Sequence, residues 1–157
     1  MIAQKEVAPV LVVDTKEYLD NVCALLRQGH TPVSIPVSGN SMCPFLHPGD
    51  QVFLELPEGK LKRGEVVLFT RPTGQYVLHR IRKVNADGSF VMMGDNQTWT
   101  ERVESARQIH AKVVAVQRKG KLSKPGDGDW WFYENPWLWC APVRKQICQM
   151  YGRLKKK

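Results

Sequence analysis

The chain has few of the features that mark metal-binding, disulfide-rich or membrane-spanning proteins. Its four cysteines form no Cys-x-x-Cys pair, so the sequence predicts no metal site and no cofactor. The apolar run within residues 1–13 is too short to cross a bilayer and is interrupted by Pro9. Because the cysteines are expected to be free thiols and no signal peptide is recognised, we expect a cytoplasmic or peripheral membrane location.

Acidic residues are scarce in one part of the chain, the last forty residues. Up to Gln117 there are 13 Lys and Arg against 12 Asp and Glu, whereas from Arg118 onward there are 10 against 3. This basic segment also contains four of the five tryptophans, and beyond Pro142 its apolar residues recur at helical spacing. The pattern predicts a basic amphipathic helix that lies on an anionic membrane surface, covers the core of the domain or binds a partner protein. Nucleic acid is not an expected partner, because the positive charge is not interleaved with stacking aromatics in a recognised module.

Residues 32–120 contain short β-branched runs and turn-forming sequences in place of long helical patterns. Strands are expected at residues 51–56, 65–70, 75–84, 89–93 and 110–117. Strands without helices between them imply a mainly β fold of coiled antiparallel sheets or a barrel. Before this region, Asp14 and Glu17 predict a capped amphipathic helix that ends at Gly29, and residues 1–13 predict an edge strand.

The segment Pro36–Asp50 contains the main candidate for chemistry, Ser41. Gly39, Asn40 and Pro44 prevent regular structure here, so we expect a stiff loop that presents the Ser41 hydroxyl. A hydroxyl becomes a useful nucleophile when a base takes its proton and donors stabilise the oxyanion that its attack creates. Backbone N–H groups in the loop are candidates for those donors. The alternative for a serine in such a segment is turn formation without catalysis.

A base and two acids follow Ser41 along the chain. His79 lies in an expected strand whose alternating neighbours Val77 and Ile81 are apolar, which predicts a partly buried imidazole. Asp95 and Glu101 follow in a second loop rich in Gly and Asn. Serine, imidazole and carboxylate together form a complete set for acyl transfer. A histidine that only packs in the core, and loop acids that bond their own backbone, are the structural alternatives.

Four short sequences in this order resemble the boxes of a known family. SGNSMCPFLHPGD resembles the nucleophile box of the type I signal peptidases and their relatives, which include the self-cleaving SOS repressors. RGEVVLF is similar to the next box, with Glu65 in place of the common Asp, and MGDN is similar to the last. LHRI stands where most bacterial members carry Lys-Arg, so His79 resembles the general base of the endoplasmic-reticulum and archaeal type. The resemblance covers about residues 34–119.

This resemblance implies a role for each candidate. Ser41 would be the nucleophile and His79 the general base, with Asp95 and Glu101 as the accompanying acids, although Glu101 replaces the family's Asp. The N–H of Ser41 would stabilise the oxyanion. Four residues around it are the further candidates for oxyanion or substrate binding: Ser38, Gly39, Asn40 and Met42.

The implied function is a serine endopeptidase of the signal-peptidase type that cleaves a leader or signal peptide within a preprotein substrate. The alternative is a non-catalytic or regulatory domain that binds peptides or membranes with the same fold. A self-cleaving repressor is not expected, because residues 1–30 are too few for a helix-turn-helix. The expected organisation is an N-terminal strand and helix at 1–30, a signal-peptidase-like catalytic domain at 31–120 and a Trp-rich basic tail at 121–157.

Overall fold

The computed structural model describes residues 15–156. The edge strand expected within residues 1–13 and the capping residue Asp14 lie outside the described residues. The helices are α1 (Thr15–Arg27), η1 (Ala106–Gln108), α2 (Gly128–Glu134), α3 (Pro136–Trp139), η2 (Ala141–Val143) and α4 (Arg144–Leu154). The strands are β1 (Val33–Pro36), β2 (Gln51–Glu55), β3 (Val66–Thr70), β4 (Tyr76–Val84), β5 (Phe90–Met93), β6 (Glu101–Val103), β7 (Ile109–Arg118) and β8 (Lys121–Ser123).

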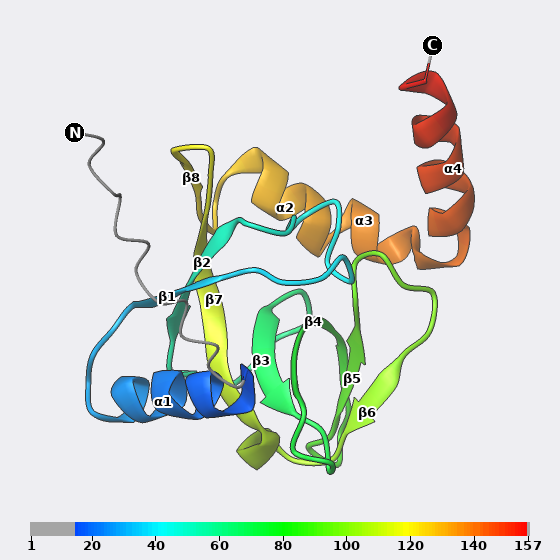
Figure 1. The fold of residues 1–157 in the computed structure, drawn as a ribbon. Coiled ribbons are helices and arrows are strands. Elements are labelled where there is room, and N and C mark those ends of the chain that lie inside the picture. The colour runs from blue at the N-terminus through cyan, green and yellow to red at the C-terminus, as the bar shows by residue number, and fades with distance from the viewer. Residues whose placement is uncertain (1–14, 157) are drawn as a thin grey trace, which may run out of the picture.

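The eight strands form one antiparallel sheet in the order β1-β2-β7-β3-β4-β5-β6, with β8 paired to β7 (Figure 1). The predicted mainly β fold is confirmed. Within the described residues the end strands β1 and β6 do not pair, so the sheet is strongly coiled but is not a closed barrel. The sequence did not predict β6 and β8, because three-residue strands are too short to show an alternating pattern.

Strand β3 is buried on both faces, and its alternating side chains enter two separate cores. Val66 and Leu68 belong to the larger core, which lies between α1 and strands β1, β2 and β7. Val67 and Phe69 belong to the smaller core, which β4, β5 and β6 enclose. Because successive side chains of a strand point to opposite faces, a single strand joins the two cores. The candidate site lies between the part of the sheet that encloses the larger core and the part that encloses the smaller core.

Helix α1 has the amphipathic pattern that the sequence predicted. Its buried residues are Leu19, Val22, Cys23 and Leu26, which recur at helical spacing and pack in the larger core. The helix lies across the β1 end of the sheet and contacts β1 (Figure 1). The N-terminal turn of α1 therefore forms one end of the groove described below.

The basic C-terminal segment divides into a packed part and an exposed part. Trp130 and Trp137 are buried, and the Trp130 ring packs edge-on against Phe45 with centroids 5.2 Å apart. Helix α4 extends away from the sheet (Figure 1), and Arg144 is its one buried residue. The predicted C-terminal basic helix is confirmed, but the idea that it covers the core is wrong for α4. In residues 15–156, no helix is both long enough and apolar enough to span a membrane.

Candidate active site

The loop that carries Ser41 is closed at its base by backbone hydrogen bonds. Val37 N–H donates to the Asp50 carbonyl at 2.8 Å, and Gly49 N–H donates to the Val37 carbonyl at 3.0 Å. The Asp50 carboxylate accepts from the Arg118 guanidinium at 2.6 Å, which ties the loop to β7. These contacts hold both ends of the loop in one place, as expected for a stiff frame.

His79 lies on β4 with a relative exposure of 2%. The rings of Phe69 and Trp99 lie 6.2 Å from the imidazole, centroid to centroid. Its Nδ1 atom is 3.2 Å from Oε1 of Glu101, which is within ion-pair distance, but the two groups are not aligned as a hydrogen bond. Catalytic hydrogen bonds are often long in the absence of substrate and shorten in the complex, so this geometry is compatible with a base and its orienting acid.

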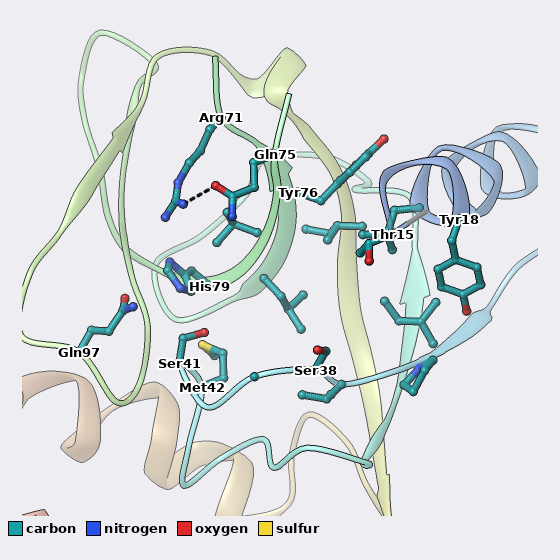
Figure 2. Close-up of a pocket in the computed structure, with 18 of the residues that line it drawn as sticks. Thr15, Tyr18, Ser38, Ser41, Met42, Arg71, Gln75, Tyr76, His79 and Gln97 are labelled. Carbon is teal, nitrogen blue, oxygen red and sulfur yellow. Dashed lines mark hydrogen bonds between the residues drawn. The ribbon is translucent and has the colours of Figure 1, made fainter. Parts of the chain in front are cut away.

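Ser41 and His79 face each other across one end of a cavity of about 740 Å³ (Figure 2). In Figure 2 the Ser41 side chain lies at the same end of the cavity as the imidazole, with its hydroxyl directed into the cavity, and no hydrogen bond joins the two side chains in the described part of the chain. Ser41 comes from the loop after β1 and His79 from the middle of β4, so two distant segments bring the hydroxyl and the imidazole to one place.

Glu101 is held in position by Arg71, a residue that the sequence analysis missed. The Arg71 guanidinium donates from Nε to Oε2 at 2.7 Å and from Nη2 to Oε1 at 2.8 Å. This two-point contact keeps the carboxylate ionised and lowers the pKa of Glu101. Arg71 also donates to Gln75 at 2.9 Å (Figure 2). No sequence signal could identify Arg71, because it follows β3 and meets Glu101 only through the fold.

Asp95 lies in a different environment from Glu101. Its side chain is fully buried and forms a two-point ion pair with Arg80, with Nε–Oδ1 and Nη2–Oδ2 distances of 2.9 and 2.8 Å. Arg80 also donates to the Gly64 carbonyl at 2.7 Å, and the Asp95 carbonyl accepts from Trp137 Nε1 at 2.9 Å. Asp95 therefore joins β4, the loop after β5 and α3, whereas Glu101 lies beside the imidazole.

Burial sets the protonation state of His79. Removal from water lowers the pKa of the imidazole below its ordinary value, although the Glu101 carboxylate partly offsets this effect by raising it. The Arg71 guanidinium, which is bound to Glu101, lowers the pKa of His79 again. The imidazole is therefore neutral at neutral pH and able to accept a proton.

The Ser41 loop offers several hydrogen-bond donors that the protein itself does not use. Within residues 15–156, the backbone N–H groups of Gly39, Asn40, Ser41 and Met42 donate to no protein acceptor. Gly39 has φ of +78°, which turns the chain just before the serine. Ser38, Gly39 and Met42 line the cavity and Met42 is buried, whereas Asn40 is exposed and does not line it. Figure 2 shows Ser38 on the cavity wall next to β1.

A second loop, residues 94–97, binds the backbone of the Ser41 loop through hydrogen bonds. Asn96 N–H donates to the Ser41 carbonyl at 2.9 Å, and the Asn96 side chain donates to the Asn40 carbonyl at 3.2 Å. A Cβ atom at Gly94 would lie 2.5 Å from the Ser41 carbonyl oxygen, so only glycine allows the two backbones to lie this close. The glycine of the MGDN sequence thus has a steric role beside the serine.

The C-terminal segment holds this second loop in turn. The Arg144 guanidinium is buried and donates to the carbonyls of Gly94 at 3.1 Å and Gln97 at 3.3 Å. It also donates to the Trp137 carbonyl at 3.0 Å, which fixes the start of α4 against α3. Each guanidinium contact satisfies a main-chain acceptor, so Arg144 joins the loop at residues 94–97 to the distant C-terminal segment.

The cavity forms a groove between two open strand edges. Among residues 15–156, β1 on one side pairs only with β2. On the other side, the first part of β4, residues 76–79, pairs only with β3 in the same range, because β5 begins opposite Arg80. Unpaired backbone groups along such edges can bind a further strand. The apolar side chains that line the groove include Leu19, Ile35, Val37, Met42, Leu68, Val77 and Leu78. Within residues 15–156, no cluster of His, Cys, Asp or Glu is arranged to hold a metal ion.

Comparison with known proteins gives one finding. A family model described as Peptidase S24-like matches residues 7–116, which includes Ser41, His79, Asp95 and Glu101. The searches of curated proteins and of solved structures found no match. The residues after 116, including the basic segment with Arg144 and α4, lie beyond the matched region.

Proposed function

The chain belongs to the Peptidase S24-like family, and from this premise we propose that it is a serine endopeptidase with Ser41 as nucleophile and His79 as general base. The observation that carries the proposal is the meeting of the two side chains at one end of the groove, with Glu101 3.2 Å behind the imidazole. Nucleophile, base and orienting acid are the three parts that acyl transfer requires.

In the proposed reaction, Ser41 Oγ attacks the scissile carbonyl carbon while His79 Nε2 takes the hydroxyl proton. The free N–H groups of the Ser41 loop donate to the carbonyl oxygen as it becomes an oxyanion, with the Ser38 hydroxyl as a further donor. The imidazolium then gives its proton to the leaving amine, and the C–N bond breaks to leave an ester on Ser41. A water molecule, deprotonated by His79, hydrolyses this ester and restores the serine.

Glu101 acts in this proposal as the orienting acid. Its carboxylate faces Nδ1 of His79, which leaves Nε2 to exchange a proton with Ser41, and it stabilises the imidazolium that forms. Arg71 holds the carboxylate in place without touching the reacting atoms. Asp95 has a positioning role, because its ion pair with Arg80 supports the loop behind Ser41.

The groove favours an extended peptide as substrate. A peptide strand that entered between β1 and the first part of β4 would pair with both open edges and place one peptide bond beside Ser41. Its alternate side chains would meet the apolar wall, so we propose small or apolar residues at those positions. Leader or signal peptides contain small and apolar residues of this kind. We therefore propose, more specifically, a signal-peptidase activity that uses the Ser/His pair.

The test is incubation of the protein with a peptide library that carries small and apolar residues at alternate positions, with the products identified by mass spectrometry. We expect cleavage by the wild type and by Ser123→Ala, a half-buried serine on β8 whose hydroxyl donates to Asp129, and none by Ser41→Ala. Equal cleavage by all three proteins would overturn the assignment. Peptides that bind in the groove but stay intact with the wild type would instead favour a non-catalytic peptide-binding domain.

The pH dependence of cleavage provides a second prediction. Because burial lowers the pKa of His79, kcat/KM should rise as His79 loses its proton, with a midpoint below the ordinary value of 6.5, and then reach a plateau. Replacing Glu101 with glutamine removes the charge that raises this pKa, so the midpoint should move to still lower pH. Initial rates from about pH 4 to 9 measure both values. A wild-type rate that continued to rise above about pH 8 would point to a lysine base and contradict the prediction.

A further inference from the structure

Helix α4 exposes its apolar side chains to solvent. Five apolar residues lie on one side of the helix axis, with relative exposures from 37% to 71%: Val143, which directly precedes the helix, and Ile147, Met150, Tyr151 and Leu154 within it. Residues three and four apart share a helix face, so these side chains form one continuous stripe. We call this set the α4 stripe. A stripe of this kind normally packs against a partner.

The α4 stripe does not face the domain. The side of α4 that borders the domain carries Arg144, Lys145, Cys148 and Gln149, which line a cavity of about 470 Å³ together with residues 96–99. At about 100° per residue, Lys145 and Gln149 project from the side of the helix opposite Ile147 and Leu154. A small movement of α4 toward the sheet would therefore close that cavity and leave the stripe exposed.

The charge around the stripe is positive only. No Asp or Glu follows Glu134, and four cationic residues of the last segment are exposed in the described chain: Lys145, Arg153, Lys155 and Lys156. A second copy of the chain would bring like charges together along such a short helix, which disfavours self-association through α4. An anionic surface, in contrast, would attract the whole segment.

Exposed aromatic rings occur in the C-terminal segment that contains the helix. Trp139, at the end of α3, is 70% exposed, and Trp131 on α2 is 59% exposed. Tyr151 adds a third ring, within the α4 stripe itself. Tryptophan and tyrosine are enriched where water meets lipid, since one end of each ring system is apolar and the other forms hydrogen bonds. This composition favours a lipid surface over an acidic protein as the occupant.

We propose that α4 lies on the surface of an anionic lipid bilayer, with its stripe among the acyl chains and its lysines at the headgroups. At 11 residues the helix is about 16 Å long, far less than the roughly 30 Å of the hydrocarbon core, so it lies along the surface. Arg144 joins the start of α4 to the loop behind Ser41, so binding would keep the groove close to the bilayer. The proposal concerns binding alone and stands apart from the proposed cleavage.

The experiment is flotation of the full chain with vesicles of phosphatidylcholine alone or with 30% phosphatidylglycerol. We expect binding to the anionic vesicles, and at least a tenfold loss for Met150→Ser/Leu154→Ser, which removes apolar burial. Lys155→Gln/Lys156→Gln should lose about fivefold per charge, and raised salt should weaken binding of the wild type. The matched controls are Leu122→Ser on β8 and Lys60→Gln, two exposed positions far from α4 in sequence, which should bind as the wild type does.

Several results would overturn the proposal. Absence of binding to anionic vesicles would exclude a lipid surface and favour an acidic protein partner. Binding that the stripe variant and the control variant share equally would place the contact elsewhere. A doubled molar mass in light scattering that Met150→Ser/Leu154→Ser abolishes would assign the stripe to a second copy. Circular dichroism checks that each variant keeps its helix content, and the exposure of the changed residues makes this the expected result.

Discussion

Replacing His79 with alanine is expected to lower kcat/KM by about 10⁴- to 10⁶-fold, and adding Ser41→Ala is expected to lower it no further. The two side chains act as one unit in the proposed reaction, because the hydroxyl attacks only when the imidazole takes its proton. Loss of either one therefore removes the same contribution. The measurement is the cleavage rate of one library peptide by the wild type, the two single variants and the double variant.

The control for this series is His110→Ala. His110 lies on β7, where its ring accepts or donates a hydrogen bond at 3.0 Å with Thr70, and it does not line the groove. This variant should retain most of the activity. If the losses of Ser41→Ala and His79→Ala instead multiplied in the double variant, the two residues would act independently, and the proposed proton transfer between them would be wrong.

Replacing each acid by its amide is expected to lower activity in one case, Glu101→Gln, and stability in the other, Asp95→Asn. Glu101→Gln should lower kcat by about 10³- to 10⁴-fold with little change in stability, since the amide no longer holds the imidazole in the productive tautomer. Asp95→Asn should destabilise the fold by about 3–5 kcal/mol, because the buried Arg80 guanidinium loses its charged partner. Activity and the midpoint of urea unfolding, measured on both variants, separate the two roles.

Asp87→Asn is the matched control for the unfolding measurement on Asp95→Asn. Asp87 also pairs with an arginine, Arg102, at 2.7 Å, but both side chains are more than half exposed. The amide of Asn keeps an oxygen that can accept from Ser89, so the unfolding midpoint should be nearly unchanged. A stable but inactive Asp95→Asn, together with an active Glu101→Gln, would reverse the assignment. In that case Asp95 would be the acid that serves His79, and the contact at 3.2 Å would be structural.

The sheet could be predicted because its strands carry their own signals. The run YVLHRIRKV is rich in β-branched and aromatic residues, and the turns around it are rich in Gly and Pro, so the expected strand at 75–84 agrees with β4 at Tyr76–Val84. The helix expected before Gly29 agrees with α1 for the same reason, because Leu19, Val22 and Leu26 repeat at helical spacing. Short elements such as α3, with four residues, carry too little pattern to be identified in this way.

The site was only partly predictable. Ser41, His79, Asp95 and Glu101 could be selected from residue type and from the family resemblance. The roles of the two acids could not be divided, because the sequence placed both in one loop, whereas Glu101 is the first residue of β6. Trp99 and Arg71 could not be selected at all. Each is an ordinary residue near the end of a strand, and each matters through a neighbour brought to it by strand pairing.

The amino-acid sequence by itself determined the class of fold, the loop that exposes Ser41, the burial of His79 and the basic character of the last segment. These follow from local properties: alternation of apolar residues, turn-forming residues and the count of charges. The tertiary structure alone decided that Glu101 faces the imidazole while Asp95 pairs with Arg80, that Arg144 supports the loop behind the serine, and that the α4 stripe faces solvent. Such contacts join residues tens of positions apart, and their formation depends on strand order and packing, which no local pattern records.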